Sequence, residues 1–123
     1  MKIAVAGTGY VGLVTGTCLA KIGHTVVCVD KEAGKIAQLQ RGESPIYEPG
    51  LEAEIVAAKE AGRLHFTTDY ADAYRGAEVI MIGVATPENT DGSANLQALY
   101  HVCEQIAASI TSPTLVVVKS TVP

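Results

Sequence analysis

The sequence has 123 residues, of which 48% are hydrophobic and 18% are charged, and its formal net charge is −4. This length is typical of one domain with one core, and this hydrophobic content excludes a disordered chain. The nine basic residues form no cluster and the apolar runs are too short to cross a bilayer, so we expect no nucleic acid and no membrane as partners. Met1 and Lys2 lead directly into an apolar run without the pattern of a secretory signal, which favours a cytoplasmic protein.

The first thirty residues predict a strand, a helix and a second strand. Residues 2–6 and 25–29 are apolar on both faces, as in buried parallel strands. Between them, apolar residues spaced by three and four predict a helix that begins at Tyr10 and ends near Gly23. The expected inward stripe consists of Val11, Val14, Cys18, Leu19 and Ile22.

The middle of the chain departs from simple alternation of strand and helix. A second helix is predicted over residues 32–41. Two prolines and a glycine make residues 43–50 a loop. A third helix over residues 51–61 and a third strand over residues 63–68 follow. The segment from 43 to 62 is longer than a strand-to-strand crossover needs.

The last third returns to alternation. Asp69 is the expected N-cap of a short helix, and residues 78–84 predict a fourth buried strand. A polar loop over residues 85–95 leads to a long helix capped by Asn95, and residues 114–119 predict a fifth strand. The expected inward stripe of the long helix is Leu96, Leu99, Tyr100, Cys103, Ile106, Ala107 and Ile110. Apolar strands that alternate with helices predict an α/β fold, a doubly wound parallel sheet in three layers α/β/α.

Residues 7–12, GTGYVG, match the pattern GxGxxG between the first strand and the first helix. In this context Gly7 permits a tight turn, Gly9 lets a pyrophosphate approach the backbone, and Gly12 lets the helix pack closely on the strand. The N–H groups at the helix start would then hold the phosphates. The pattern in this context predicts a Rossmann-like dinucleotide site.

Asp30 ends the second strand, near the spacing at which an acidic residue accepts hydrogen bonds from the adenosine ribose. A carboxylate at this place would repel a 2′-phosphate, so NAD is favoured over NADP. Lys31 and Lys35 lie close by in sequence, and either is able to meet such a phosphate.

Three polar segments follow predicted strands: Asp30, residues 85–87 and residues 119–121. Ligands of an open parallel sheet bind beyond the carboxyl ends of its strands. Thr86 and Thr121 can each donate and accept a hydrogen bond there, although ordinary turn chemistry also accounts for either residue alone.

No metal site is predicted. The three histidines, His24, His65 and His101, are far apart and share no ligand spacing, so we interpret them as surface or strand-end residues. The three cysteines, Cys18, Cys28 and Cys103, are expected to be reduced, buried thiols. No Ser-His-Asp or paired-carboxylate arrangement follows from spacing.

Five segments together resemble a known family. They are KIAVAGTGYVGLVTGTCLAKIGHTVVCVD, SPIYEPGL, GRLHFTTD, TPENTDGSANL and KSTVP. In this combination they resemble the amino-terminal NAD-binding domain of the UDP-glucose/GDP-mannose dehydrogenase family, and most of all its bacterial UDP-glucose 6-dehydrogenases. Members of that family oxidise the C6 alcohol of a sugar nucleotide to a carboxylate in two NAD-dependent hydride transfers, through a covalent adduct on a catalytic cysteine.

The resemblance implies roles for individual residues. The pyrophosphate would lie at residues 7–12, and the adenosine ribose at Asp30 and Lys35. Ser120 would contact the nicotinamide side, and Thr121 would be a catalytic residue that helps to position water. The implied cofactor contacts are Gly7, Gly9, Tyr10, Val11, Gly12, Asp30, Lys35, Val84, Thr86, Pro87, Ser120 and Thr121.

In that family the chain continues beyond STVP into segments that supply the catalytic Lys, Asn, Asp and Cys. Cys18, Cys28 and Cys103 do not match the glycine-flanked catalytic cysteine. We therefore expect residues 1–123 to be an NAD-binding domain truncated at its carboxyl end, which binds NAD but is inactive alone. A UDP-sugar substrate would be bound through other domains, and the parent enzyme is expected to be a homo-oligomer. The fifth strand would leave an unpaired apolar edge, so the chain alone is expected to be marginally stable or to associate.

Three other interpretations remain open. A nucleotide-sensing regulatory module of a transport system also begins with a strand, GxGxxG and an acidic residue after the second strand, but it needs neither the 43–62 segment nor KSTVP. A GDP-mannose 6-dehydrogenase would share the same cofactor domain. A methyltransferase that binds S-adenosylmethionine fits the glycine spacing less well than a dinucleotide enzyme does.

Overall fold

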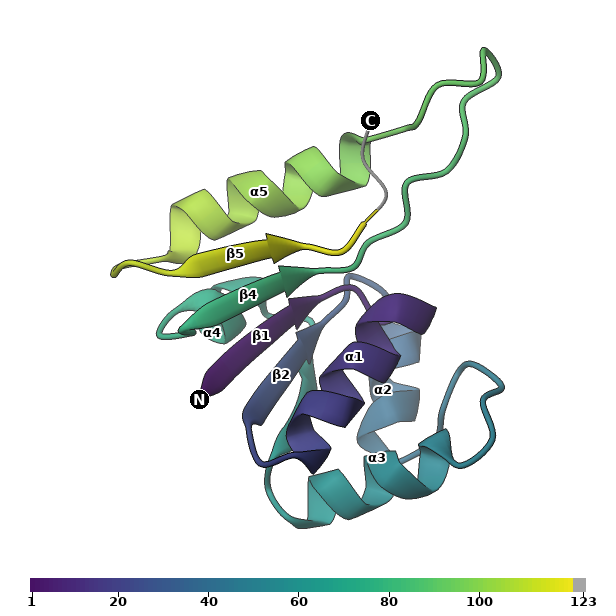
Figure 1. Ribbon diagram of the computed structural model, residues 1–123, viewed down its shortest axis with the longest axis vertical. Coiled ribbons are helices and arrows are strands. Elements are labelled where there is room, and N and C mark those ends of the chain that lie inside the picture. The colour runs from purple at the N-terminus through teal and green to yellow at the C-terminus, as the bar shows by residue number, and fades with distance from the viewer. Residues whose placement is uncertain (121–123) are drawn as a thin grey trace.

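The predicted parallel strands form one twisted sheet, with a long loop extending beyond one end of it (Figure 1). The structure is a computed structural model, and it describes residues 1–120. In chain order the elements are β1 (Lys2–Ala6), α1 (Tyr10–Lys21), β2 (Thr25–Val29), α2 (Ala33–Gln40), α3 (Leu51–Glu60), β3 (Leu64–Thr67), α4 (Tyr70–Tyr74), β4 (Val79–Ile82), α5 (Gln97–Ser109) and β5 (Leu115–Val118). Over the described residues, the strand order is β3-β2-β1-β4-β5 and every pair is parallel.

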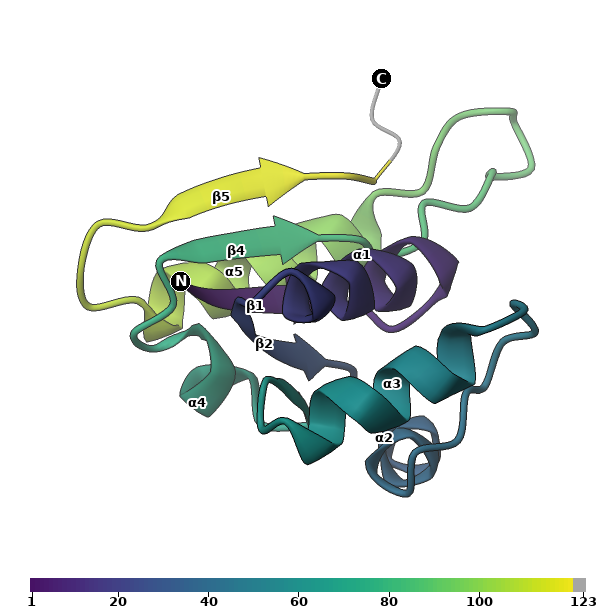
Figure 2. The same cartoon turned by 60° about the horizontal axis from the view of Figure 1, so that its bottom comes forward.

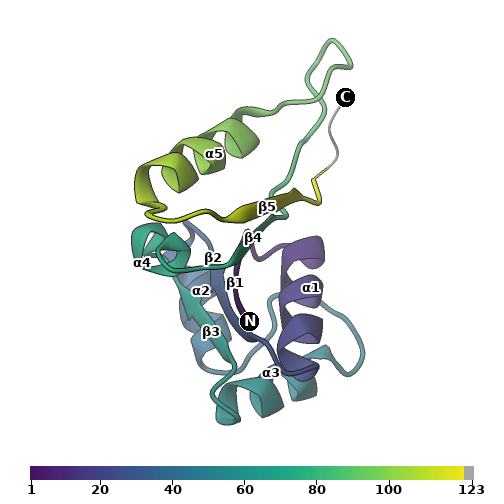
Figure 3. The same ribbon diagram turned by 60° about the vertical axis from the view of Figure 1, so that its left-hand side comes forward.

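The helices cover both faces of the sheet and make the expected three layers. Helices α1, α2 and α3 share one hydrophobic core with residues of β1, β2 and β3, whereas α4 and α5 share a second core on the opposite face. Figure 3 shows α1 and α3 on one side of the sheet and α4 and α5 on the other. The α/β, doubly wound, Rossmann-like fold predicted from the sequence is therefore confirmed.

The strand register brings the carboxyl ends of neighbouring strands to one edge of the sheet. Ala6 pairs with both Val29 and Ile82, and Ile82 pairs with Val118. The segments that follow β1, β2, β4 and β5 consequently begin side by side. Strands β2 and β3 are added on one side of β1, and the chain then returns to add β4 and β5 on the other side. In such folds ligands bind where this order of strands reverses, between β1 and β4.

The buried face of α1 agrees with the predicted stripe only in part, because Val14 and Leu19 pack against the core but three other predicted residues do not. Val11 is 43% exposed, Ile22 is 72% exposed, and Cys18 is exposed as well. The face that meets the sheet is made mainly of small residues instead: Gly12, Leu13, Gly16, Thr17 and Ala20. The reason is that α1 lies very close to the sheet, and a Cβ atom at Gly16 would be 2.8 Å from Cys28 Sγ. Large apolar side chains are therefore displaced from this face.

The inward stripe of α5 is only partly as predicted. Leu99 and Ile106 are buried, but Tyr100 is 60% exposed and Cys103 is exposed. Val102 and Ser109 are buried in their place. Helix α5 packs mainly on α4, so its buried face is narrower than the apolar stripe of the sequence. The predicted cap at Asn95 is not observed, because the N-cap of α5 is Leu96 and no side chain caps the helix. Asn95, one residue earlier, accepts a hydrogen bond from Gln97 N on its Oδ1 at 3.1 Å.

The expectation of buried thiols is correct only for Cys28, where burial raises the pKa to about 12. Strand β5 lies at one edge of the sheet (Figure 2) and is largely exposed, whereas β3 at the opposite edge buries Leu64 and Phe66. Within the described part of the chain, no helix is long and apolar enough to cross a membrane.

Candidate functional site

The turn between β1 and α1 depends on its first and third glycines for different reasons. Gly7 has φ +99°, a left-handed conformation that side chains disfavour, and its N–H donates to Val29 O at 2.8 Å. A Cβ atom at Gly12 would be 2.0 Å from the carbonyl oxygen of Gly7. Gly7 therefore makes the tight turn, and Gly12 lets α1 start directly against it.

Gly9 has different surroundings from the other two. It is the N-cap of α1 in an extended conformation that any residue can adopt, and a Cβ atom there would meet no atom of residues 1–120 within 4 Å. Neither backbone strain nor protein packing therefore requires glycine at this position. The open space above Gly9 fits a group that approaches the backbone from outside, as a pyrophosphate does.

The start of α1 is suited to an anion. The first N–H groups of a helix have no partner within it, and the helix dipole places a partial positive charge there. No side chain caps α1, and its first turn contains no acidic residue. The N–H groups of Tyr10 and Val11 are among those at this end, directly beside the open space of Gly9.

Asp30 follows β2 and is held by hydrogen bonds from both sides. Its Oδ2 accepts from the N–H and the hydroxyl of Thr8 at 3.0 and 2.7 Å, and its Oδ1 accepts from Glu32 N at 3.0 Å. Lys35 Nζ lies 3.5 Å from Oδ2. Burial raises the pKa of Asp30, but the hydrogen bonds from Glu32 and Thr8 and the Lys35 charge lower it more, so the net pKa lies below the ordinary value. Asp30 is thus a fixed carboxylate at the edge of the site.

A cavity of about 110 Å³ lies beside Asp30, between the carboxyl end of the sheet and α5. Its lining includes residues that sequence reasoning missed, namely Tyr74, Ala98, His101, Val102 and Gln105. His101 is exposed, as predicted for a surface residue, but it also lines this cavity, and helical spacing does not reveal which loop a helix faces. An aromatic and aliphatic lining beside a carboxylate suits a flat nucleobase attached to a ribose.

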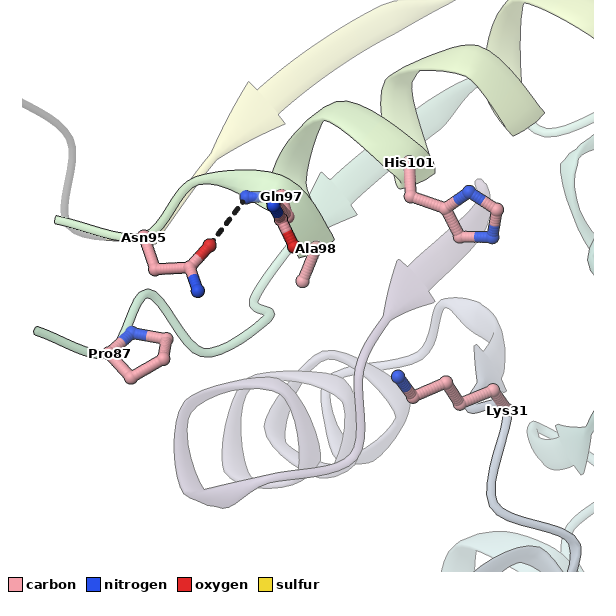
Figure 4. Close-up of a pocket in the computed structure, with 6 residues that line it drawn as sticks. All are labelled: Lys31, Pro87, Asn95, Gln97, Ala98 and His101. Carbon is pink, nitrogen blue, oxygen red and sulfur yellow. Dashed lines mark hydrogen bonds between the residues drawn. The ribbon is translucent and has the colours of Figure 1, made fainter. Parts of the chain in front are cut away.

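An adjoining cavity of about 460 Å³ shares Lys31, Ala98 and His101 with the first. Figure 4 shows Lys31, on the segment after β2, and His101, on α5, lining this cavity, with Pro87 and Asn95 farther along. Pro87, predicted as a cleft residue, therefore lies at this end rather than beside the glycine turn.

A third cavity, of about 290 Å³, lies on the other side of the β1–α1 turn. Six predicted cofactor contacts line it together: Gly9, Tyr10, Val11, Val84, Thr86 and Ser120. Ser120 Oγ donates to Val84 O at 2.7 Å, which ties the segment after β5 to the segment after β4. Thr121 lies outside the described residues. Apart from Pro87, the described candidates thus follow one another from Lys35 and Asp30 past the glycine turn to Ser120.

A comparison with protein families gives a match over residues 1–123 to the UDP-glucose/GDP-mannose dehydrogenase family, NAD binding domain. The chain is 48% identical over 124 residues to the UDP-glucose 6-dehydrogenase of Rhizobium meliloti. It is also 48% identical over 123 residues to the UDP-glucose 6-dehydrogenase YwqF of Bacillus subtilis. Each match covers 100% of this chain and 28% of the relative, so the chain spans little more than a quarter of the length of these curated relatives.

Solved structures agree with this assignment. A GDP-mannose dehydrogenase from Pseudomonas aeruginosa, in a ternary complex, superposes with a TM-score of 0.96 at 40% identity, over 99% of this chain and 29% of that one. A UDP-glucose dehydrogenase from the archaeon Pyrobaculum islandicum superposes with a TM-score of 0.93 at 38% identity, over 98% of this chain and 29% of that one.

Proposed function

The chain belongs to the UDP-glucose/GDP-mannose dehydrogenase family, as its NAD binding domain, and from this premise we propose that it is the cofactor-binding part of a UDP-glucose 6-dehydrogenase. One observation carries the proposal. The open space at Gly9 lies between the fixed carboxylate of Asp30 and the cavity at Ser120, which matches a ligand with a ribose at one end and a long pyrophosphate bridge. The similarity to UDP-glucose 6-dehydrogenases then favours UDP-glucose as the substrate.

The adenosine half of NAD is assigned to the end with Asp30. The Asp30 carboxylate would accept hydrogen bonds from the ribose, and Lys35 would lie beside it. The adenine would enter the cavity lined by Tyr74 and Val102. The pyrophosphate would lie at Gly9, on the N–H groups at the start of α1.

The nicotinamide half is assigned to the opposite end. Val84 and Thr86 line the cavity there, and Ser120 closes it. When bound, NAD would accept a hydride at this end. Oxidation of an alcohol to a carboxylate removes four electrons, and each NAD accepts two, so the reaction consumes two NAD per sugar nucleotide. Thr121, outside the described residues, is proposed as a catalytic residue that helps to position water, as the family resemblance implies.

The chain's own cysteines do not suit a covalent step. Cys28 is buried, and burial raises its pKa to about 12, so it is neither accessible nor ionised. Cys18 and Cys103 are exposed on α1 and α5, but among the described residues neither lines the three cavities. We propose that a nucleophilic cysteine belongs to another part of the enzyme and that residues 1–123 alone do not oxidise a sugar nucleotide.

The remaining assignments are coarser. A cytoplasmic location is supported by the exposed, unpaired thiols of Cys18 and Cys103, which persist in a reducing compartment. A homo-oligomeric parent enzyme is proposed only from the family resemblance.

The test is an assay of the full-length protein with NAD or NADP and with UDP-glucose or GDP-mannose, followed by NADH absorbance and product analysis. We expect NAD-dependent oxidation of UDP-glucose to the acid, with two NADH formed per product. Preference for GDP-mannose would replace UDP-glucose as the proposed substrate, in line with the GDP-mannose dehydrogenase structure from Pseudomonas aeruginosa. Tight NAD binding without oxidation of either sugar nucleotide would support a nucleotide-sensing module and overturn the enzymatic proposal.

A further inference from the structure

Thr8, between the first two glycines of the turn, has a specific partner. The glycine pattern leaves this position unspecified and assigns it no role. The residue is completely buried, at 0% exposure, and its hydroxyl donates to Asp30 Oδ2 at 2.7 Å. Its backbone N–H donates to the same oxygen at 3.0 Å. The glycine turn and Asp30 are thus joined directly by two hydrogen bonds.

The two oxygens of Asp30 are unequally occupied. A carboxylate offers about four acceptor positions, two on each oxygen. Oδ2 has both of its positions taken by Thr8, and Lys35 Nζ also lies 3.5 Å from it. Among residues 1–120, Oδ1 accepts only from Glu32 N, at 3.0 Å, which leaves one of its positions free. The side chain is 12% exposed and lines the 110 Å³ cavity, so a ligand reaches Asp30 through a small window.

We propose that Thr8 is a positioning residue for the dinucleotide. Its hydroxyl fixes the Asp30 carboxylate, so that the free acceptor position on Oδ1 is presented to the 2′-hydroxyl of the adenosine ribose. This inference rests on the proposed function, because it requires NAD to lie with its adenosine end at Asp30. Thr8 acts through Asp30 and does not contact the ligand.

The Thr8→Val substitution isolates this role. Valine keeps the branched shape and the backbone N–H, so one hydrogen bond to Oδ2 remains and the path of the turn is preserved. The lost bond is short and ends on a charged acceptor, the stronger class of hydrogen bond. With it gone, among the described residues only the backbone N–H groups of Thr8 and Glu32 still bind the carboxylate by hydrogen bonds, so its orientation is held less firmly.

The chain offers a matched control in Thr17. It is also a threonine at 0% exposure, but its Oγ1 has no hydrogen-bond partner within residues 1–120. Thr17→Val therefore makes the same chemical change at the same burial, without affecting Asp30. Thr8→Ser is the conservative counterpart, because it retains a hydroxyl.

The experiment measures equilibrium binding of NAD and of NAD whose adenosine ribose lacks the 2′-hydroxyl, using the full-length protein. We expect Thr8→Val to weaken NAD binding roughly tenfold, as expected for loss of a hydrogen bond to a charged group. Binding of the 2′-deoxy analogue should change by less than about twofold, because the contact that Thr8 supports is already missing from it. Thr8→Ser and Thr17→Val should bind both ligands nearly as the unsubstituted protein does.

The outcomes separate a positioning role from a structural one. Equal weakening of both ligands by Thr8→Val would mean that the substitution merely loosens the turn, and it would overturn the inference, as would unchanged NAD binding. If Thr8→Val does not fold, Thr8→Ala repeats the comparison with a smaller side chain. Failure of the unsubstituted protein to bind NAD would overturn the proposed function, and the inference with it.

Discussion

Gly9 and Gly12 belong to the same turn but are glycine for different reasons. At Gly12, a Cβ atom would overlap the carbonyl oxygen of Gly7, a backbone atom that cannot rotate away. At Gly9, a Cβ atom would project into open space, and the backbone conformation suits any residue. The protein therefore needs Gly12 to fold, whereas it needs Gly9 only when something lies against the turn.

We expect Gly12→Ala to change the stability of the fold and Gly9→Ala to change NAD binding. Gly12→Ala should destabilise the fold by about 3 kcal/mol or more, because the clash is with the backbone. Gly9→Ala should leave the melting temperature nearly unchanged but weaken NAD binding about tenfold or more, since its methyl group occupies the pyrophosphate position. Thermal melts and NAD titrations of both variants check this. A Gly9→Ala protein that binds NAD normally would remove the phosphate site from this turn.

Individual residues were predictable from sequence where their role depends on local backbone geometry. The turn-forming roles of Gly7 and Gly12, and the place of Asp30 after β2, follow from a pattern of glycines between a strand and a helix. Tyr74 and His101 were not predictable, because they reach the cavity through tertiary packing. Nothing in their sequence spacing relates them to Asp30.

Helix α1 is the element that packs unusually close to the sheet. Its buried face is mainly small, and a Cβ atom at Gly16 would be 2.8 Å from Cys28 Sγ and 3.5 Å from Val26 Cγ1. This close packing keeps the start of α1 against β1, where the turn needs it. A glycine in mid-helix normally costs stability, and here the short helix-to-sheet distance is the reason for it.

We expect Gly16→Ala to destabilise the protein by about 1 kcal/mol, because overpacking of about 1–3 kcal/mol exceeds the gain in helix propensity. Gly34→Ala is the matched control: it lies in α2, a Cβ atom there would meet nothing within 4 Å, and it should stabilise by about 0.5–1 kcal/mol. Chemical denaturation measures both effects.

A double variant localises the overlap. Cys28→Ala removes the atom nearest to the new methyl group, so Gly16→Ala with Cys28→Ala should be more stable than the two separate effects predict. Strict additivity of the two changes would show that Gly16 and Cys28 do not compete for the same space.

The elements themselves were predictable, but the face of α1 was not. Apolar spacing correctly indicated a helix between β1 and β2, yet it assigned the inward side to the large residues Val11 and Ile22. Small residues carry no strong hydrophobic signal. When only large side chains are counted, the inward face of a helix that packs through glycine is therefore assigned to the wrong side of the helix axis. The same limit explains why Tyr100 was wrongly placed inside.

The molecule as a whole has one strand edge with little protection. Strand β5 lies at an end of the sheet order, with Leu115 63% exposed, Val116 40% exposed and Val118 45% exposed. Exposed apolar edge strands are templates for association with another chain. In a protein of full length, additional residues can cover this edge, whereas residues 1–120 leave it accessible.

We therefore expect residues 1–123, expressed alone, to associate as concentration rises. Leu115→Lys should reduce association, because a charged side chain on an edge strand opposes pairing with a second copy. Ile22→Lys is the control, since Ile22 is 72% exposed but lies at the end of α1. Sedimentation velocity at several concentrations distinguishes them. A monomeric unsubstituted chain at high concentration would contradict the expectation.

The three-layer architecture was predictable as a whole, because strands apolar on both faces need helices on both sides. For β5 the sequence predicts an unpaired backbone edge, but it does not predict the exposure of the side chains. Its outward-facing side chains were expected to be buried like those of β1, and they are not, since the helices of the described residues cover the sheet mainly over β1 to β4.

The position of β1 in the middle of the sheet has a consequence for the order of folding. A ribosome makes β1 first, and β2 soon provides a neighbour on one side, with Lys2 opposite Thr25. The other side stays unpaired until β4 is made, since Ile3 pairs with Val79. Most of the chain must therefore emerge before the central strand is complete. During most of its synthesis, a nascent chain of this domain therefore exposes one edge of β1, a strand that is buried in the folded protein. This apolar strand is a natural target for chaperones.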